Sequence, residues 1–245
     1  MPHPGKLSGS ATAAYRQRQP TSAAVTRSRL ARSPSMSDAT PGEDTAAASE
    51  ERLFAAERLV FFSDAVVAIA ITLLALELPL PEGITGTELL RSLGDHKSEY
   101  VSFLISFAVI GGHWRAHHRL FEHVTTVNAG LIRISFSWLL MQVIMPFATK
   151  VIGGDGAFEF RFVFYAIVQV IAMSAFLLMV WQIQRHHLYR TDTPPELFGR
   201  TYRGSGVMIA AFAVSIPVAF FTQWAYACWI VVPLVSGLLL RSRKA

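Results

Sequence analysis

Six long apolar segments constrain the fold of this chain more than any other feature. They cover about 58–80, 98–119, 129–149, 161–183, 205–221 and 224–240. Most of them approach the roughly 20 residues with which a helix crosses a bilayer. A segment that faces lipid must satisfy its own backbone hydrogen bonds, and an α-helix does so. We therefore expect an all-α, polytopic membrane protein with six transmembrane helices.

The composition agrees with a membrane protein. Hydrophobic residues make up 52% of the 245 residues and charged residues only 16%, whereas soluble domains carry about 25% charged residues. The net charge of +5 is interpreted as a topology signal, because cytoplasmic loops are rich in Lys and Arg. No nucleic-acid partner is expected. Cys228 is the single cysteine of the chain, which excludes an intramolecular disulfide.

The distribution of basic residues supports six spans with both termini in the cytoplasm. With this topology, and leaving out residues 1–50, twelve basic residues are cytoplasmic and four lie on the opposite side, as the positive-inside rule requires. The twelve are Arg52, Arg58, Arg115, Arg119, Arg133, Arg185, Arg190, Arg200, Arg203, Arg241, Arg243 and Lys244, and the four are Arg91, Lys97, Lys150 and Arg161. Five or seven spans would remove this asymmetry.

The first fifty residues differ in composition from the rest of the chain. They are rich in Ala, Ser, Thr, Pro, Arg and Gly, with Tyr15 as their only aromatic residue. Such a segment buries too little apolar surface to fold, so we expect 1–50 to be a disordered tail and 51–245 to be the transmembrane domain. Met36 begins a stretch that resembles a natural amino terminus and is a second candidate start of translation.

The first span contains a carboxylate, Asp64, in the stretch "RLVFFSDAVVAIAITLL". A charged group inside a span is costly, so it is expected to be buried, partnered and functional. Arg58 lies six residues away, about 120° around the helix, so the partner should come from another helix. The second span ends in "HWRAHHRLF", at a similar membrane depth. An Asp–His or a Ser–Trp bridge between the two spans is the expected contact.

The histidines of the second span allow three interpretations. They could fix helix packing, they could sense protons because their intrinsic pKa lies near neutrality, or they could bind a metal. His113 and His117 have the spacing of helical ligands. Zinc sites need further protein ligands, and no second cluster is evident, so we expect no metal. Packing is the simplest of the three interpretations.

A stripe of four side chains lies beside Asp64 on the first helix. Ile69, Thr72, Leu73 and Leu76 fall on one face when the segment is laid out at about 100° per residue. Taken alone, this stripe is typical of ordinary lipid-facing or core packing. Glu77, which follows it, could attract cations at a pore mouth or could simply face solvent at the interface.

Two linked motifs give the sequence a resemblance to a known family. The first is Arg58, three intervening residues, then Phe62, Ser63 and Asp64, followed by "AIAITLL"; the second is Trp114, two intervening residues and His117. Together they resemble the transmembrane protein 175 family of potassium channels over residues 52 to about 241. One departure is Ala65, where the family often has Gly.

The resemblance implies a fold and an assembly. A single six-helix repeat corresponds to the bacterial members, which assemble as homotetramers with the first helices around the pore. The family's pore positions correspond to Ile69, Thr72, Leu73 and Leu76. Arg58, Phe62, Ser63, Asp64, Trp114 and His117 would form a motif network that holds the helices in a conductive arrangement. The permeant ion would be potassium, with no cofactor, in the plasma membrane of a bacterium.

The resulting hypothesis is a potassium-permeable cation channel. The chain contains no "TVGYG", so the carbonyl filter of ordinary potassium channels is absent, and a hydrophobic constriction would take its place. A proton-permeable channel or proton-coupled transporter is the main alternative, based on Asp64 and the histidines. An assembly protein without transport is another. No serine–histidine pair in an elbow, paired acids or phosphate loop supports an enzyme.

Overall fold

The structure is a computed structural model in which residues 41–242 are described. The chain divides into two units, Met1–Ala47 and Ala48–Ala245, and the second holds the apolar part of every long helix. The first helix, α2, runs from Pro41 to Leu76. Residues 41–50, which were expected to belong to the disordered tail, are therefore helical. The rest of that tail, including the alternative start at Met36, lies outside the described residues.

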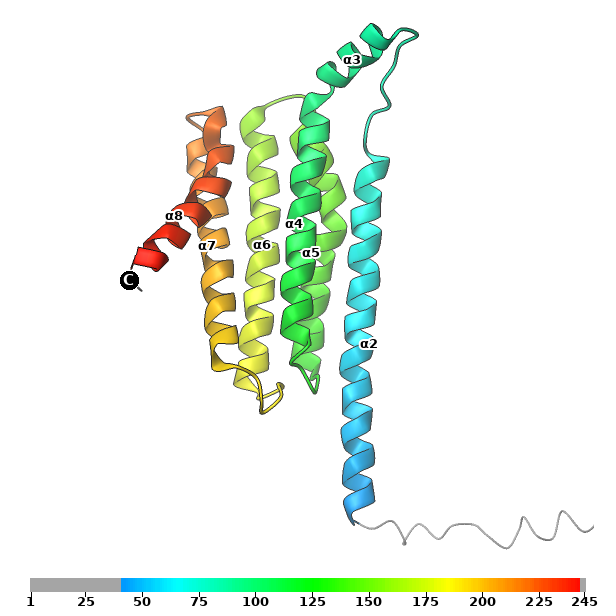
Figure 1. The fold of residues 1–245 in the computed structure, drawn as a ribbon, viewed down its shortest axis with the longest axis vertical. Helices are drawn as coiled ribbons and strands as arrows, with labels where there is room; N and C mark the ends of the chain where they lie inside the picture. Colours follow the sequence, from blue (N-terminus) through cyan, green and yellow to red (C-terminus); the bar gives the residue numbers. More distant parts are fainter. Residues whose placement is uncertain (1–40, 243–245) are drawn as a thin grey trace, which may run out of the picture. The chain divides into compact units, whose positions relative to one another are not determined.

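Every apolar segment of the sequence corresponds to a helix (Figure 1). After α2 follow α4 (Lys97–Phe121), α5 (Ala129–Gly153), α6 (Phe158–Arg185), α7 (Pro195–Ala219) and α8 (Cys228–Ser242). Two shorter elements connect them, α3 (Gly86–Asp95) and the 3₁₀-helix η1 (Gln223–Ala227). No strand occurs between residues 41 and 242. The prediction of an all-α protein is confirmed, and each of the six predicted spans corresponds to one helix.

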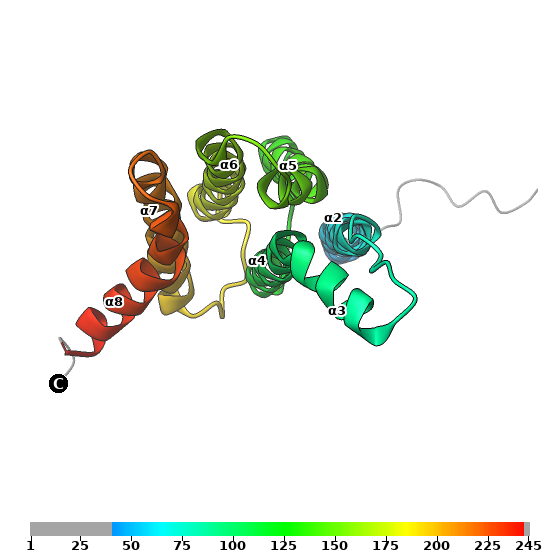
Figure 2. The ribbon, with the colours of Figure 1, turned by 90° about the horizontal axis from the view of Figure 1, so that it is seen from above.

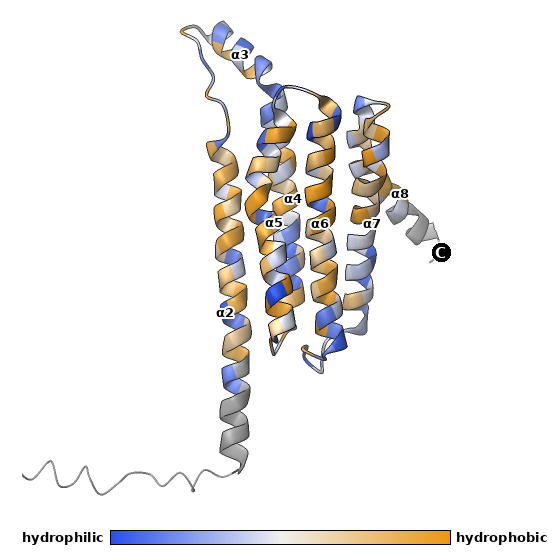
Figure 3. Ribbon diagram, turned by 180° about the vertical axis from the view of Figure 1, so that it is seen from behind, coloured by the Kyte–Doolittle hydropathy of each residue, from blue (hydrophilic) through white to orange (hydrophobic). Residues whose placement is uncertain are grey.

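Four helices are long and apolar enough to cross a membrane by length and composition: Leu53–Leu76 within α2, α5, α6 and α7. The other two predicted spans differ from these for separate reasons. α8 has only 15 residues. α4 is less apolar because four of its seven buried residues are polar, namely Ser102, Ser106, His113 and His117. The hydrophilic residues of α4 stand out against the apolar part of α2 in Figure 3.

Helices α4, α5, α6 and α7 pack side by side in chain order, and α8 packs on α7 (Figure 2). Large side chains fill the space between them. Trp138, Tyr165, Phe162, Phe176 and Phe212 are each at most 2% exposed. Burial of such aromatic surface is a large favourable term in the packing of these helices.

Local sequence signals set several helix ends. Thr85 and Glu88 form a capping box at the start of α3, and the Asn128 side chain accepts a hydrogen bond from the Leu131 N–H at the start of α5. Both satisfy backbone groups that a helix end leaves unpaired. At the end of α5, the guanidinium of Arg161 donates to the carbonyls of Ile152 and Gly154. The amphipathic α3 was not anticipated from the apolar pattern.

Candidate pore helix and motif network

The two sides of α2 have opposite environments. Leu59, Ser63, Val67, Ala70 and Leu74 are buried against the rest of the chain, each at most 8% exposed. Their spacing of three and four residues defines one helix face. The four residues of the predicted stripe lie on the other side and are all exposed: Ile69 at 58%, Leu73 at 39%, Leu76 at 80%, and Thr72. The stripe is thus available for contacts outside this chain.

The only hydroxyl of this stripe has its hydrogen engaged. Thr72 Oγ1 donates to the carbonyl oxygen of Ile69 on its own helix, at 2.8 Å. The hydroxyl oxygen keeps its acceptor lone pairs. A threonine in this arrangement can offer an oxygen ligand to a cation between the apolar side chains of Ile69 and Leu76.

Asp64 finds its partner on α4, as expected, but the partner is not a histidine. Trp114 Nε1 donates to Asp64 Oδ1 at 3.0 Å. The expected pairings, Asp–His or Ser–Trp, are therefore both wrong. Ser63 is fully buried and donates to the carbonyl of Leu59 in its own helix, at 2.8 Å. The reason is geometric. Trp114 of α4 faces Asp64, which is half-buried on α2, whereas Ser63 lies on the buried face of α2 and its hydroxyl bonds to the backbone of its own helix.

The Phe62 side chain contacts a second helix, whereas the Arg58 side chain does not pair with a described charge. The Phe62 ring lies 5.5 Å from that of Phe136 on α5, centroid to centroid. The motif therefore contacts α5 as well as α4. Arg58 is exposed, and its guanidinium forms no ion pair with any described residue.

His117 lies in the interior of the helix bundle. Its ring stacks on Trp138 of α5 at 4.6 Å and on Phe121 at 4.2 Å, and the residue is 1% exposed. One turn away, His113 Nδ1 lies 3.3 Å from Gln142 Oε1. The amide oxygen can only accept, so His113 Nδ1 carries the hydrogen. Both histidines thus pack α4 against α5, as the simplest interpretation proposed.

Trp138 and Gln142 are the contacts that the sequence reasoning missed. They stand four residues apart in the third apolar segment and so share a helix face. A glutamine in an apolar run is itself a signal, because a buried amide needs hydrogen-bond partners. Among residues 41–242, no group of three or more His, Cys, Asp or Glu side chains is arranged to hold a metal ion.

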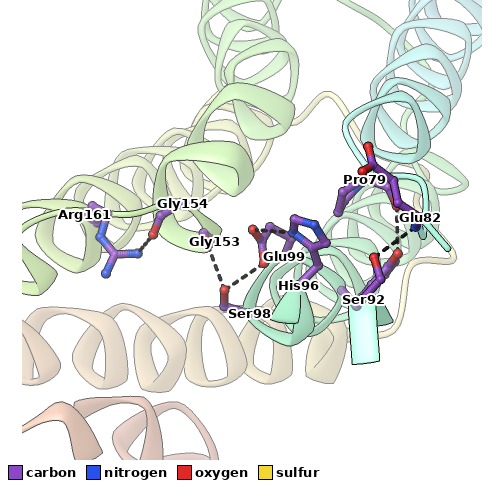
Figure 4. Close-up of polar contacts among 10 residues, drawn as sticks. Pro79, Glu82, Ser92, His96, Ser98, Glu99, Gly153, Gly154 and Arg161 are labelled. Carbon is purple, nitrogen blue, oxygen red and sulfur yellow. Dashed lines mark hydrogen bonds and ion pairs between the residues drawn. The ribbon is translucent and has the colours of Figure 1, made fainter. Parts of the chain in front are cut away.

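Glu77, at the end of α2, forms an ion pair that was not expected. Its carboxylate lies 2.6 Å from Lys150 Nζ on α5, with the two side chains 37% and 65% exposed. Neighbouring polar contacts join the same ends of the helices (Figure 4). Ser98 of α4 donates to the carbonyl of Gly153 at 3.0 Å, and the His96 ring lies 3.4 Å from Glu99. Polar contacts therefore stabilise this end of the helix bundle.

Comparisons with known proteins agree with the motifs. The family model for the endosomal/lysosomal potassium channel TMEM175 matches residues 58–146. A potassium channel of Streptomyces collinus is 33% identical over 144 residues, 56% of this chain and 70% of that protein. A potassium channel of Chamaesiphon minutus is 30% identical over 184 residues, 68% of this chain and 85% of that one. The endosomal/lysosomal proton channel TMEM175 of mouse is 29% identical over 154 residues, 58% of this chain but only 31% of that protein.

Solved structures share the fold. The crystal structure of a lysosomal potassium-selective channel TMEM175 homolog from Chamaesiphon minutus has a TM-score of 0.60 and 25% sequence identity. The match covers 75% of this chain and 96% of that one. The helices, the motif network and these similarities define a membrane ion channel rather than an enzyme. The chain belongs to the TMEM175 family.

Proposed function

We propose that this chain forms a homotetrameric, potassium-permeable cation channel in a bacterial plasma membrane. The observation that carries the proposal is the exposed stripe Ile69, Thr72, Leu73 and Leu76 on a helix whose other face is packed. The bacterial relatives that are named potassium channels support potassium as the ion. Arg115 and Arg119 lie near the end of α4, and Arg200 and Arg203 near the start of α7. These arginines support a cytoplasmic location for that end of the bundle and for both termini, through the positive-inside rule.

In the proposed pore, the α2 helices of four subunits surround one axis. Steps of three and four residues place the levels of Ile69, Thr72 and Leu76 about 5 Å apart along the helix. Rings of Ile69 and Leu76 would then form a hydrophobic constriction that gates by dewetting. The hydroxyl oxygen of Thr72 would offer contacts to a partly dehydrated cation between these rings. No carbonyl filter takes part.

The motif network would keep the stripe in position. The Asp64–Trp114 hydrogen bond and the Phe62–Phe136 contact attach α2 to α4 and α5. His117 would act indirectly on α2, by packing α4 against α5. Arg58 forms no ion pair with a described residue, so any role for it would depend on other subunits or on lipid headgroups.

Potassium flux from liposomes tests the proposal. Replacing Ile69 and Leu76 by Asn places amides in the constriction and should raise the flux several-fold, because a wetted pore has a lower barrier. Leu178→Asn is the matched control, since Leu178 is a similarly exposed residue (52%) on α6. An unchanged flux in both Ile69→Asn and Leu76→Asn would show that the pore assignment is wrong.

Proton permeation is the second candidate, since the mouse relative is named a proton channel. His113 and His117 are buried between α4 and α5, away from the exposed stripe, which argues against a histidine relay in the pore. The same liposomes, under a pH gradient and without potassium, separate the two. Proton leak that survives His117→Ala would exclude the relay through His117.

A further inference from the structure

A cavity of about 880 Å³ opens between the end of α4, the middle of α6 and the first half of α7. It lies at the end of the bundle where α4 finishes at Phe121 and α7 begins at Pro195; we call this the basic end. The cavity has two unlike parts. Met173, Phe176 and Met208 form an apolar floor, whereas Arg119, His123 and Arg200 line its mouth.

The mouth of the cavity carries unneutralised positive charge. Arg119 and Arg200 are exposed, and neither forms an ion pair with a described residue. Glu196 is the one carboxylate in the wall. His123 Nδ1 lies 3.1 Å from the carbonyl oxygen of Arg119 and donates to it, so this ring is held at the mouth by the backbone of α4.

This combination fits one class of ligand. Guanidinium groups bind phosphate oxygens through paired hydrogen bonds, and basic pockets between transmembrane helices bind anionic lipid headgroups. A soluble phosphate would leave the floor of Met173, Phe176 and Met208 in contact with water. An acyl chain covers such a floor. We propose that the cavity binds an anionic phospholipid, with its phosphate at Arg119 and Arg200 and an acyl chain along α6 and α7.

Native mass spectrometry of the purified full-length protein tests this proposal. Phosphatidylglycerol and phosphatidylcholine are supplied together, and the bound lipid is counted. The test variant is Arg119→Gln with Arg200→Gln. The control is Arg115→Gln with Arg203→Gln, which removes the same charge from the same two helices outside the cavity. Phosphatidylglycerol retention should fall about tenfold or more in the test variant, since each basic residue near a lipid phosphate contributes several-fold. It should persist in the control.

Four results would overturn the proposal. Equal losses in the two double variants would reflect general surface charge, and equal retention in both would show that the arginines do not bind lipid. Displacement by glycerol 3-phosphate would indicate a site for a soluble phosphate. Loss of higher oligomers in the test variant alone would identify the cavity as a subunit interface. Should the double variant not fold, each single variant is expected to lose part of the binding.

Discussion

Asp64 illustrates how one residue fixes the position of a helix. A carboxylate in an apolar helix is costly to bury unless it is paired and hydrogen-bonded, and here it is only half-buried and accepts from the Trp114 indole. The cost of moving Asp64 into lipid then opposes any rotation of α2. Such a rotation would also carry Ile69 and Leu76 away from their present direction.

A double-mutant cycle measures this link. Trp114→Phe keeps an aromatic ring but removes the donor, so it should lower stability by about 1 kcal/mol, below the range for fully buried hydrogen bonds to charged groups. Asp64→Ala should then cost less in the Trp114→Phe background than in the wild type. Thermal unfolding of the purified protein gives the four values. Strictly additive losses would mean that the hydrogen bond contributes nothing.

A contact of Asp64 with the second span could be predicted from the sequence, but the atom that donates to its carboxylate could not. The cost of an unpaired carboxylate requires a partner for Asp64 and places it on another helix, and the structure agrees. The choice of Trp114 over a histidine depends on the rotation of α4, which is set by Trp138 and Gln142 on α5. Those contacts join residues 21 to 29 positions apart in the chain, so no local pattern reveals them.

At the scale of helices, α4 shows why hydropathy alone is an incomplete guide. Its buried face carries serines and histidines, while exposed Val101, Leu104 and Phe107 lie on other faces. The long apolar segments 129–149 and 161–183 correspond closely to α5 and α6. A long apolar segment in lipid satisfies its backbone hydrogen bonds by forming a helix. Helix α3 was not predicted, because a capping box in a polar connection is a weak indication of a helix.

Two glycines on neighbouring helices should respond oppositely to alanine. A Cβ on Gly153 of α5 would lie 3.2 Å from Glu99 Cα and 3.3 Å from Ser102, whereas one on Gly111 of α4 meets no atom within 4 Å. Gly153→Ala should force α4 and α5 apart and lower stability by about 1–2 kcal/mol. Gly111→Ala should be neutral or stabilising by up to about 1 kcal/mol. Melting temperatures in detergent test the pair, and a drop for Gly111→Ala alone would contradict the packing described.

The start of α3 should be sensitive to acid. The Glu88 carboxylate accepts from the Ile84 and Thr85 N–H groups at 2.8 and 3.1 Å, and these backbone hydrogen bonds hold the pKa of Glu88 below its ordinary value of 4.5. The capping contribution is therefore complete above pH 4.5 and is lost as the pH falls through the lowered pKa of the folded state.

Amide exchange measures this effect directly. Protection factors of the Ile84 and Thr85 amides should be constant at neutral pH and fall in acid. Glu88→Gln keeps an oxygen acceptor but cannot be protonated in this range, so its protection should not change with pH. The same acid dependence in Glu88→Gln would show that another group is responsible.

At the scale of the whole molecule, the chain buries only part of its own apolar surface. One face of α2 is packed and the other exposes Ile69, Leu73 and Leu76. The sequence placed these residues on one stripe from helical periodicity, but a single chain cannot show what they face. Either lipid or the hydrophobic constriction of a pore would accommodate the apolar side chains of Ile69 and Leu76. Thr72, with a free acceptor oxygen beside them, favours the axis.

The most direct test is an experimental structure of the assembled protein in lipid nanodiscs. We predict four subunits around one axis, with the α2 helices innermost and the Ile69 and Leu76 side chains at the narrowest points. Thr72 should lie between them with its oxygen toward the axis. A tetramer in which this stripe faces lipid, or a protein that stays monomeric, would contradict the account.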